Sequence, residues 1–371
     1  GSVLIIAYHP PFVQRFPNSL PHFTDSQIKV PETGEDSCCY KGNKVAVGIP
    51  CYNEEVTIRE VIENVRKYIP FAQIYVFDNN SSDNTYKIAM EALCNYPVDE
   101  GKRDCVKGGV LRVKNQGKGN VVLRFFADIE ADLYVLIDGD STYDCASIKK
   151  MIDKVLDEHL DMLVGRRIEV HEDPNNKTYR RGHRFGNIFL TNSISWIFDQ
   201  KANKRNFRDM LSGFRVVSRR FAKSFVTLST GFEIETQLNV HALQLKMPCG
   251  EINTPYFARP TGSCSKLSTY EDGFKILYTI FKLYSTEKPF FFYSSISLVL
   301  ACISIILAIP IVSDYLATGL VPRLPTALLA TGLMLSAIIS FFSGLLLENV
   351  TKARLENQRA SYLKYKAPWK K

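Results

Sequence analysis

The sequence lacks the patterns by which proteins most often hold zinc or cradle phosphate groups. Its nine cysteines include no C-x-x-C pair, which argues against a structural zinc site and against a disulfide framework. No G-x-G-x-x-G follows the first predicted strand and no G-x-x-x-x-G-K-S/T occurs, so a glycine loop for phosphate is absent. The cysteine usage predicts a reducing compartment, and any bound diphosphate would need a metal ion to neutralise it.

Strong net charge is also missing. The formal charge of +8 over 371 residues is compatible with a nucleic acid, an anionic membrane surface or a phosphorylated substrate, but no nucleic-acid-binding motif supports the first of these. The length is enough for about two ordinary domains. Residues 1–43 are rich in proline and polar residues without periodicity, which predicts an N-terminal arm, with Gly1 and Ser2 as vector-derived residues.

Two long stretches near the C-terminus carry no charge. Residues 289–313 and 324–347 each exceed the ~20 residues that a helix needs to cross a bilayer, so we expect two transmembrane helices. The alternative is a buried helical hairpin in a soluble protein. Small residues in the second stretch would let the two helices pack closely in lipid; they are Ser336, Ala337, Ser340, Ser343 and Gly344.

The flanks of these stretches predict their orientation. The connector 314–323 carries one Asp and one Arg, whereas residues 348–371 are rich in Lys and Arg and form a predicted basic cytoplasmic tail. By the positive-inside rule both termini and the preceding domain are cytoplasmic. Residues 268–288 have apolar positions at helical spacing with interspersed lysines, which predicts an amphipathic juxtamembrane helix, the alternative being an ordinary core helix. The sequence therefore predicts an integral membrane protein.

Residues 44–267 alternate between strand and helix patterns. The predicted strands and helices follow one another at 44–50, 54–68, 73–79, 84–93, 110–115, 120–130 and 133–139. This alternation predicts an α/β domain with a mostly parallel sheet covered by helices on both faces. In such sheets ligands bind beyond the carboxyl ends of the strands, and three of the predicted strands end in polar clusters, at 50–54, 78–83 and 138–140.

The stretch 137-IDGDSTYD-144 places carboxylates directly after an apolar strand. On an extended backbone Asp138 and Asp140 point to one side. One of them can then hold Mg²⁺ or Mn²⁺ while the other reaches a ribose hydroxyl or a metal-bound water, and the metal acts as a Lewis acid on phosphate oxygens. A simple polar turn after the strand is the alternative interpretation.

Four motifs together resemble the family 2 glycosyltransferases, which have the Rossmann-like GT-A fold: 49-IPCYNEE-55, 76-VFDNNSSDNT-85, 115-NQGKGN-120 and 137-IDGDSTYD-144. Later segments resemble the branch that loads a sugar onto a polyprenyl or dolichyl phosphate, such as the dolichyl-phosphate mannose synthases: 165-GRR-167, 209-DMLSGFRVVSRR-220, 231-GFEIE-235 and 259-RPTGSCSKL-267. The likeness spans about residues 44 to 270. It implies a metal-dependent, inverting hexosyltransferase, and we expect its donor to be a uridine nucleotide carrying glucose or an N-acetylhexosamine.

The resemblance assigns a role to each matching position. Contacts to the nucleotide sugar would come from Pro50, Tyr52, Glu54, Asp78, Asn79, Lys118, Asp138 and Gly139. The metal, Mg²⁺ or Mn²⁺, would be held by Asp138 and Asp140. A lipid phosphate also needs a basic pocket beside the sugar diphosphate, for which the candidates are Arg167, Arg259, Ser263 and Lys266. The predicted catalytic residues are Asp140, Arg167, Arg259 and Lys266.

Several positions leave their roles open. Thr142 stands where dolichyl-phosphate mannose synthases have a metal-binding Gln, so the third protein ligand is undecided, with Asp144 as a substitute. Asn79 stands where many relatives have a second Asp. Asp209 can orient either an arginine or the sugar hydroxyls. The pair Glu233 and Glu235 is predicted to open a helix, where we prefer stabilisation of the helix dipole to sugar contact.

Two other functions fit parts of the sequence. A processive polysaccharide synthase of the same family has a comparable D-x-D region, but the Q-x-x-R-W segment is absent and two spans are few for a polymer channel. A non-catalytic, membrane-tethered protein that binds nucleotide sugars would not need Asp138, Asp140, Arg259 and Lys266 intact. The expected partners are a nucleotide-sugar donor, a polyprenyl or dolichyl phosphate and membrane lipids, without nucleic acid; a homo-oligomer is compatible with the sequence.

Overall fold

The computed structural model divides the chain into two compact units, and the second, Glu35–Lys371, contains every residue described below. The structure describes residues 39–94, 108–169, 207–226, 234–259, 278 and 281–369. Most of the expected N-terminal arm lies outside these residues, as do Ser263, Lys266 and Glu233.

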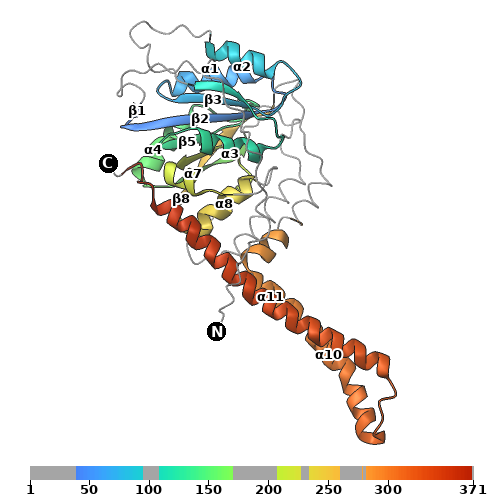
Figure 1. Ribbon diagram of the computed structural model, residues 1–371. Helices are drawn as coiled ribbons and strands as arrows, with labels where there is room; N and C mark the ends of the chain where they lie inside the picture. The colour runs from blue at the N-terminus through green and yellow to red at the C-terminus, as the bar shows by residue number, and fades with distance from the viewer. Residues whose placement is uncertain are drawn as a thin grey trace, which may run out of the picture. The chain divides into compact units, whose positions relative to one another are not determined.

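The centre of the second unit is an eight-stranded sheet with the order β4-β3-β2-β5-β7-β6-β8 and β1 beside β2 (Figure 1). The strands are β1 Cys39–Tyr40, β2 Asn43–Cys51, β3 Gln73–Asp78, β4 Gly108–Arg112, β5 Leu133–Leu136, β6 Met162–Glu169, β7 Arg215–Ser218 and β8 Cys249–Tyr256. Strands β4, β3, β2 and β5 run parallel, as do β6 and β8, whereas β7 is antiparallel to both β5 and β6. The prediction of a mostly parallel α/β sheet is confirmed.

Helices cover both faces of this sheet (Figure 1). One face carries α1 Ile58–Tyr68, α2 Thr85–Cys94 and α4 Ser147–Asp157, and the other carries α3 Lys118–Asp128, α7 Arg219–Ser224 and α8 Ile234–Gln244. Side chains of β2 alternate between the two cores, with Val45 and Val47 on the first face and Ala46 on the second. Gly48 also faces the second core, where a Cβ atom would lie 2.7 Å from the Phe125 ring.

Helix α1 begins later than the sequence pattern predicts. Its first residue is Ile58, not residue 54, and the backbone N–H groups of Glu54 and Glu55 donate to side chains of another loop. The acceptors are Thr85 Oγ1 at 2.8 Å and Asp83 Oδ2 at 3.3 Å. The two acidic residues therefore join the β2–α1 and β3–α2 loops instead of opening the helix.

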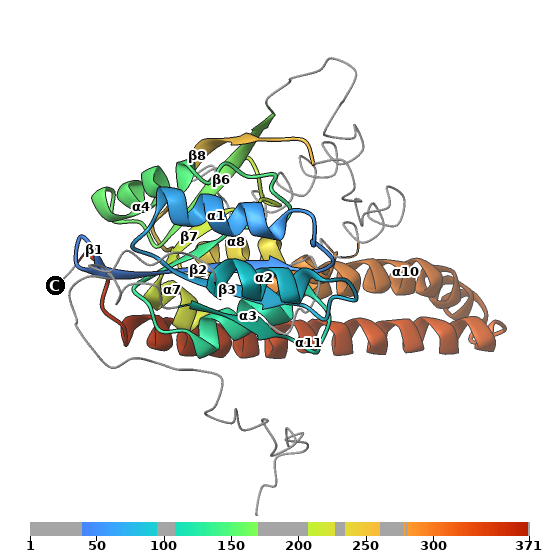
Figure 2. The same ribbon diagram turned by 90° about the horizontal axis from the view of Figure 1, so that it is seen from above.

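Two long apolar helices follow the sheet domain. Helices α10 (Pro289–Thr318) and α11 (Leu324–Leu363) lie side by side (Figure 2), and both are long and apolar enough to cross a membrane. They are candidate membrane spans. Residues 281–287, just before α10, are also helical: Leu283 is buried in the core of the sheet domain, whereas Phe281 is 58% exposed. This segment therefore has one face on the core and one face toward the surroundings.

Small and hydroxyl residues join α10 to α11. The hydroxyl of Ser304 donates to the Ala330 carbonyl at 2.8 Å, and the hydroxyl of Ser340 donates to the Tyr293 carbonyl at 3.0 Å. A Cβ atom on Gly344 would lie 3.0 Å from that of Tyr293. Of the small residues singled out in the sequence, Ala337, Ser340 and Gly344 lie at this contact, whereas Ser336 and Ser343 donate to carbonyls of their own helix.

Helix α11 continues past its apolar part and contacts the sheet domain. The Tyr362 hydroxyl donates to Asp161 Oδ2 at 2.8 Å, and the fully buried Asp161 also accepts from Arg220, at 2.5 Å and 2.6 Å. The Arg220 guanidinium lies 4.6 Å from the Tyr362 ring centre and 4.8 Å from that of Trp369. A second contact joins Glu287 to Arg354 of α11 at 2.9 Å. The expected basic tail is thus largely a helical extension that packs on α7.

A buried histidine in α8 predicts a loss of stability in acid. Burial lowers the pKa of His241 to about 3, while an unfolded histidine titrates near about 6.5. Below about pH 6.5 the imidazole is therefore protonated in the unfolded chain but neutral in the folded chain. The free energy of unfolding then falls by up to ~1.4 kcal/mol per pH unit. As the pH is lowered from about 6.5 to about 4.5, we expect the unfolding temperature of wild type to fall more steeply than that of His241→Leu. Parallel curves in this range would contradict a neutral buried imidazole.

Candidate active site

The three polar strand ends predicted from the sequence meet at one edge of the sheet. The Gly139 N–H donates to the Pro50 carbonyl at 3.3 Å, and the Asn79 N–H donates to the Cys51 carbonyl at 2.9 Å. The Thr57 hydroxyl closes the arrangement by donating to the Gly139 carbonyl at 2.6 Å. The loops after β2, β3 and β5 are therefore held together by the backbone itself, which fixes the side chains that project from them.

The D-x-D aspartates lie in a turn and not on an extended strand. Strand β5 ends at Leu136, and Ser141 has a positive φ of 57°, so the i, i+2 geometry expected for a strand does not apply. The third carboxylate, Asp144, has a local role. Its oxygens accept from the Ala146 N–H at 3.1 Å and from the Ser147 hydroxyl at 2.6 Å, at the start of α4. In this conformation both oxygens of Asp144 accept hydrogen bonds at the start of α4.

Asp138 is paired with a lysine from the first turn of α3. The Lys118 ammonium lies 2.6 Å from Asp138 Oδ1 and 2.7 Å from Glu235 Oε1. Burial would lower the pKa of Lys118, but the carboxylates of Asp138 and Glu235 outweigh it and raise the pKa well above its usual value. The lysine is therefore a charged bridge between two carboxylates.

Asp140 is paired with an arginine from the end of β8. Arg259 Nη2 donates to Asp140 Oδ2 at 2.7 Å, and the Thr142 hydroxyl donates to Asp140 Oδ1 at 2.6 Å. Thr142 thus orients the carboxylate, which is buried, with 6% of its surface exposed. Among the residues that the structure describes, no group of three or more His, Cys, Asp and Glu side chains could hold a metal. Asp138 and Asp140 stand as a pair of candidate ligands.

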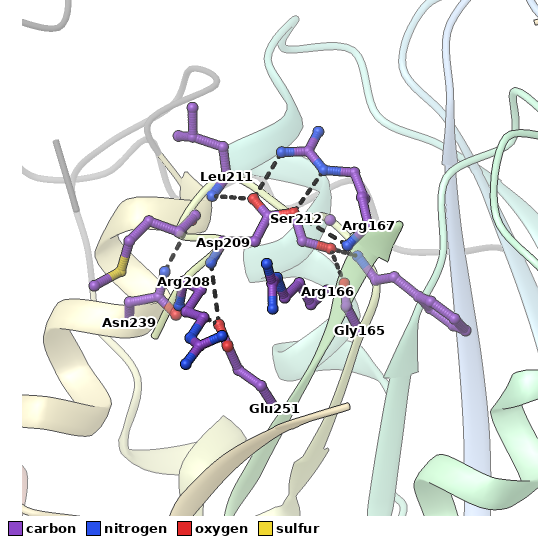
Figure 3. Close-up of polar contacts among 12 residues, drawn as sticks. Gly165, Arg166, Arg167, Arg208, Asp209, Leu211, Ser212, Asn239 and Glu251 are labelled. Atoms are coloured by element: carbon purple, nitrogen blue, oxygen red, sulfur yellow. Dashed lines mark hydrogen bonds and ion pairs between the residues drawn. The ribbon is translucent and has the colours of Figure 1, made fainter. Parts of the chain in front are cut away.

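Arg167 is fixed in position by Asp209 (Figure 3). Its Nε and Nη2 atoms each donate at 2.7 Å to a different oxygen of Asp209, a two-point contact that sets the plane of the guanidinium. Asp209 is held in turn by its own N–H, which donates to Glu251 Oε1 at 3.1 Å. Burial raises the pKa of Glu251. Of the two roles considered for Asp209, the structure supports the orientation of an arginine.

Asn79 and Asp78, two of the residues expected at the nucleotide, differ in how their side chains are bound. The side chain of Asn79 is used by the β4–α3 loop: its amide donates to the carbonyls of Val113 and Asn115, at 3.2 Å and 2.8 Å, and its oxygen accepts from the Gly117 N–H at 2.7 Å. Asp78 is different. It is fully buried, its Oδ1 accepts from the Ser81 N–H at 3.2 Å, and its Oδ2 has no hydrogen-bond donor among the described residues.

Three residues of the site were not selected as site residues from the sequence. Glu235 reaches Lys118 from α8, and Gly213 lies against Asp138, where a Cβ atom would be 2.7 Å from Oδ2. Arg215 is fully buried behind them and donates to Asn239 Oδ1 at 2.8 Å; burial lowers its pKa to about 10. The motifs 209-DMLSGFRVVSRR-220 and 231-GFEIE-235 contain all three, but only the fold brings them to the D-x-D turn.

Comparison with known proteins identifies the family. The model of glycosyl transferase family 2 matches residues 46–225. Glycosyltransferase AglJ of Haloferax volcanii is 30% identical over 253 residues, which cover 68% of this chain and 76% of that protein. The UDP-N-acetylglucosamine–dolichyl-phosphate N-acetylglucosaminyltransferase of Methanococcus voltae is 27% identical over 250 residues, covering 63% of this chain and 94% of that protein. An uncharacterized protein of Shigella flexneri is 56% identical over 157 residues, covering 42% and 96%.

A solved structure is similar at a lower level. Glucosyl-3-phosphoglycerate synthase from Mycobacterium tuberculosis, in complex with Mn²⁺ and UDP-glucose, has a TM-score of 0.48 and 18% identity and covers 66% of this chain and 79% of that chain. A likeness of this degree carries no information about the ligands of the present protein. The similarity to AglJ and the match of the family model, in contrast, are sufficient to assign the family. The chain therefore belongs to glycosyltransferase family 2, as its motifs predict, and is a hexosyltransferase.

Proposed function

We propose that this enzyme moves a hexose from a uridine nucleotide sugar to a polyprenyl or dolichyl phosphate, with Mg²⁺ or Mn²⁺ and with inversion at the anomeric carbon. One observation carries the proposal. Two carboxylates, Asp138 and Asp140, and two cations, Lys118 and Arg259, meet at the edge where β2, β3 and β5 end. This combination suits a diphosphate bound through a metal ion next to a second, lipid-borne phosphate.

The donor set fits a hard divalent cation. Mg²⁺ in such sites is bound by one or two carboxylates, while phosphate oxygens and water complete its shell. Asp138 supports this role because its side chain is 25% exposed and so remains accessible. The ion would act as a Lewis acid that stabilises the charge on the departing nucleotide. Lys118 and Arg259, which now pair with the two carboxylates, are near enough to contribute positive charge to the same phosphates.

The acceptor requires positive charge more than a base. A lipid phosphate is already an anionic nucleophile at neutral pH, so the protein has to hold it beside the sugar diphosphate against their mutual repulsion. Arg167 and Arg259 are the described residues proposed for this task, and Ser263 and Lys266 are proposed from the sequence alone. The two-point contact with Asp209 supports the role of Arg167 because a guanidinium of fixed plane loses little freedom when it binds phosphate. Direct attack opposite the nucleotide would invert the anomeric centre.

Asp78 is the residue proposed to accept a hydrogen bond from the base of a uridine nucleotide. Its Oδ1 already accepts from Ser81, which leaves Oδ2 as the acceptor without a donor among the described residues. Arg112 lies over Oδ2 at 3.5 Å, but its side chain is 63% exposed, so it can move aside. This oxygen can accept the N3–H donor of uracil. The name of the Methanococcus voltae relative, a UDP-N-acetylglucosamine enzyme acting on dolichyl phosphate, agrees with this choice.

The apolar helices support a reaction at a membrane surface. A polyprenyl phosphate keeps its chain in the bilayer, so the site has to work close to the headgroups. Helices α10 and α11 would anchor the enzyme there, and the Lys- and Arg-rich part of α11 favours a cytoplasmic location for the sheet domain and for both termini. The contacts of α11 with Asp161 and Glu287 would keep the sheet domain close to the span.

The function can be tested with the purified enzyme and a panel of labelled donors. We expect UDP-glucose or UDP-N-acetylglucosamine, and not GDP-mannose, to give a single lipid-linked sugar with polyprenyl phosphate. Proton NMR of the product should show a β linkage from an α-linked donor. A polymeric product would indicate a polysaccharide synthase, and binding of donor without any transfer would indicate a non-catalytic protein. An α linkage would contradict a single displacement.

A further inference from the structure

Glu235 contacts the D-x-D turn indirectly, through the side chain of Lys118. Its Oε1 atom is 2.7 Å from the Lys118 ammonium, which is itself 2.6 Å from Asp138 Oδ1. The side chains of Glu235 and Lys118 are 7% and 16% exposed, so water screens this arrangement little. The three residues come from α8, α3 and the turn after β5, and the charge of one lysine is shared by two carboxylates.

A glycine makes room for this arrangement. A Cβ atom at Gly213 would lie 2.7 Å from both Asp138 Oδ2 and the Lys118 ammonium. The backbone at this point is fixed, because the Gly213 N–H donates to the Tyr143 hydroxyl at 3.0 Å. No positive φ is found at Gly213, so an alanine there would have an ordinary backbone and would act only by displacing the two side chains.

Stabilisation of the helix dipole does not account for the position of Glu235. An acidic residue in a first helical turn has this effect while remaining in water. Glu235 is instead buried against a cation that has a second carboxylate as its partner. Because Glu235 shares the positive charge of Lys118, the negative charge of Asp138 is only partly neutralised. A partly neutralised carboxylate binds a divalent cation better than a fully neutralised one.

We propose that Glu235 is a positioning residue that acts through Lys118 to keep Asp138 competent for a divalent cation. The inference rests on the proposed metal-dependent function and adds to it a residue that contacts neither the ion nor the substrate. Outer partners of metal ligands commonly change metal affinity by about 10- to 100-fold. Loss of the Glu235 charge is expected to fall at the lower end of this range, because Asp138 itself stays in place.

The test measures Mn²⁺ binding by the full-length enzyme, with and without UDP, from the EPR signal of free Mn²⁺. We expect Glu235→Gln to weaken Mn²⁺ binding about tenfold, and Glu235→Asp, which keeps the charge, to weaken it less. With the active enzyme, Glu235→Gln should raise the Mn²⁺ concentration needed for half-maximal transfer, and excess Mn²⁺ should restore kcat. Glu130→Gln removes a surface carboxylate paired with Arg219 and Lys223 and serves as the matched control.

The outcomes separate this inference from the proposed function. If wild type binds Mn²⁺ and Glu235→Gln binds it equally well, the inference is wrong and the proposed function is untouched. If wild type binds no Mn²⁺ under any condition, both are wrong. Gly213→Ala keeps every charge and should weaken Mn²⁺ binding in the same direction, so it decides the matter should Glu235→Gln fail to fold. A loss of kcat that excess Mn²⁺ does not restore would assign Glu235 to the sugar instead.

Discussion

Replacing Asp140 by alanine is expected to abolish sugar transfer while the domain remains folded. The side chain is buried at the D-x-D turn and lies 2.7 Å from Arg259, so its removal takes away a proposed metal ligand and the partner of an arginine proposed to bind phosphate. Loss of Lewis-acid stabilisation is worth several kcal/mol, and ~4 kcal/mol corresponds to about a 10³-fold lower rate. The fall should appear in kcat with saturating donor, measured as lipid-linked product per unit time.

Folding should change little in this variant, since Asp140 lies beyond the end of β5 and its loss also removes repulsion from Asp138. We expect the unfolding temperature of the purified protein to stay within a few degrees of wild type, which for a domain of this size is about 1 kcal/mol. Asp140→Asn keeps an acceptor for the Thr142 hydroxyl but not the charge, and it should be as inactive. Asp128→Ala removes a carboxylate paired with Arg124 at the end of α3 and should keep wild-type activity. Near-normal turnover of Asp140→Ala, or full transfer in excess chelator, would contradict the metal role.

The fold and the edge of the site could be predicted from the sequence because they follow from local patterns. Alternating apolar strands and amphipathic helices specify a parallel sheet, and polar residues after successive strands specify its binding edge. Pro50, Asp78 and Asp138 were found in this way. These residues lie close together because the carboxyl ends of neighbouring parallel strands meet at one edge of the sheet.

The partners of the site residues could not be predicted, since each pairing depends on packing between distant elements. The sequence predicts Lys118 at the nucleotide, and the fold adds two carboxylate partners, Asp138 and, from α8, Glu235. Asp144 is a candidate substitute for the third metal ligand, because Thr142 stands where relatives have Gln. Its two oxygens accept hydrogen bonds at the start of α4, which the sequence does not predict. An aspartate just before a helix often accepts hydrogen bonds from the residues that follow it, as Asp144 does from Ala146 and Ser147.

The C-terminal segment shows a further limit of charge patterns. Its many lysines and arginines predict a basic cytoplasmic tail. Tyr362, Tyr365 and Trp369 lie among them, and their rings lie against arginines of α7. Aromatic side chains at intervals in this basic segment are the feature of the sequence that indicates packing against the sheet domain. The charges favour orientation in a membrane, and the aromatic residues favour contact with the sheet domain, so the two features answer different questions.

The contact at Asp161 leads to the second large prediction: Asp161→Ala should destabilise the folded protein by about 3–5 kcal/mol. The carboxylate is fully buried and accepts from Ser218, from two nitrogens of Arg220 and from Tyr362. Alanine would leave the Arg220 guanidinium, whose side chain is only 17% exposed, without its counter-ion. A domain is commonly stable by only about 5–15 kcal/mol, so the unfolding temperature in detergent should fall by many degrees.

Smaller changes at the same contact distinguish the contribution of the Asp161–Arg220 ion pair from that of the Tyr362 hydrogen bond. Tyr362→Phe removes one hydrogen bond but keeps the ring beside Arg220, so it should cost about 1 kcal/mol. Burial and the nearby Asp161 raise the pKa of Tyr362, which keeps its hydroxyl a donor at neutral pH. The double variant Asp161→Ala, Arg220→Leu should be more stable than Asp161→Ala alone, because it leaves no unpaired buried charge. If Asp161→Ala instead unfolds at the wild-type temperature, the ion pair does not hold α11 and α7 to the sheet, and the docking of the C-terminal helix has to rest on its aromatic contacts alone.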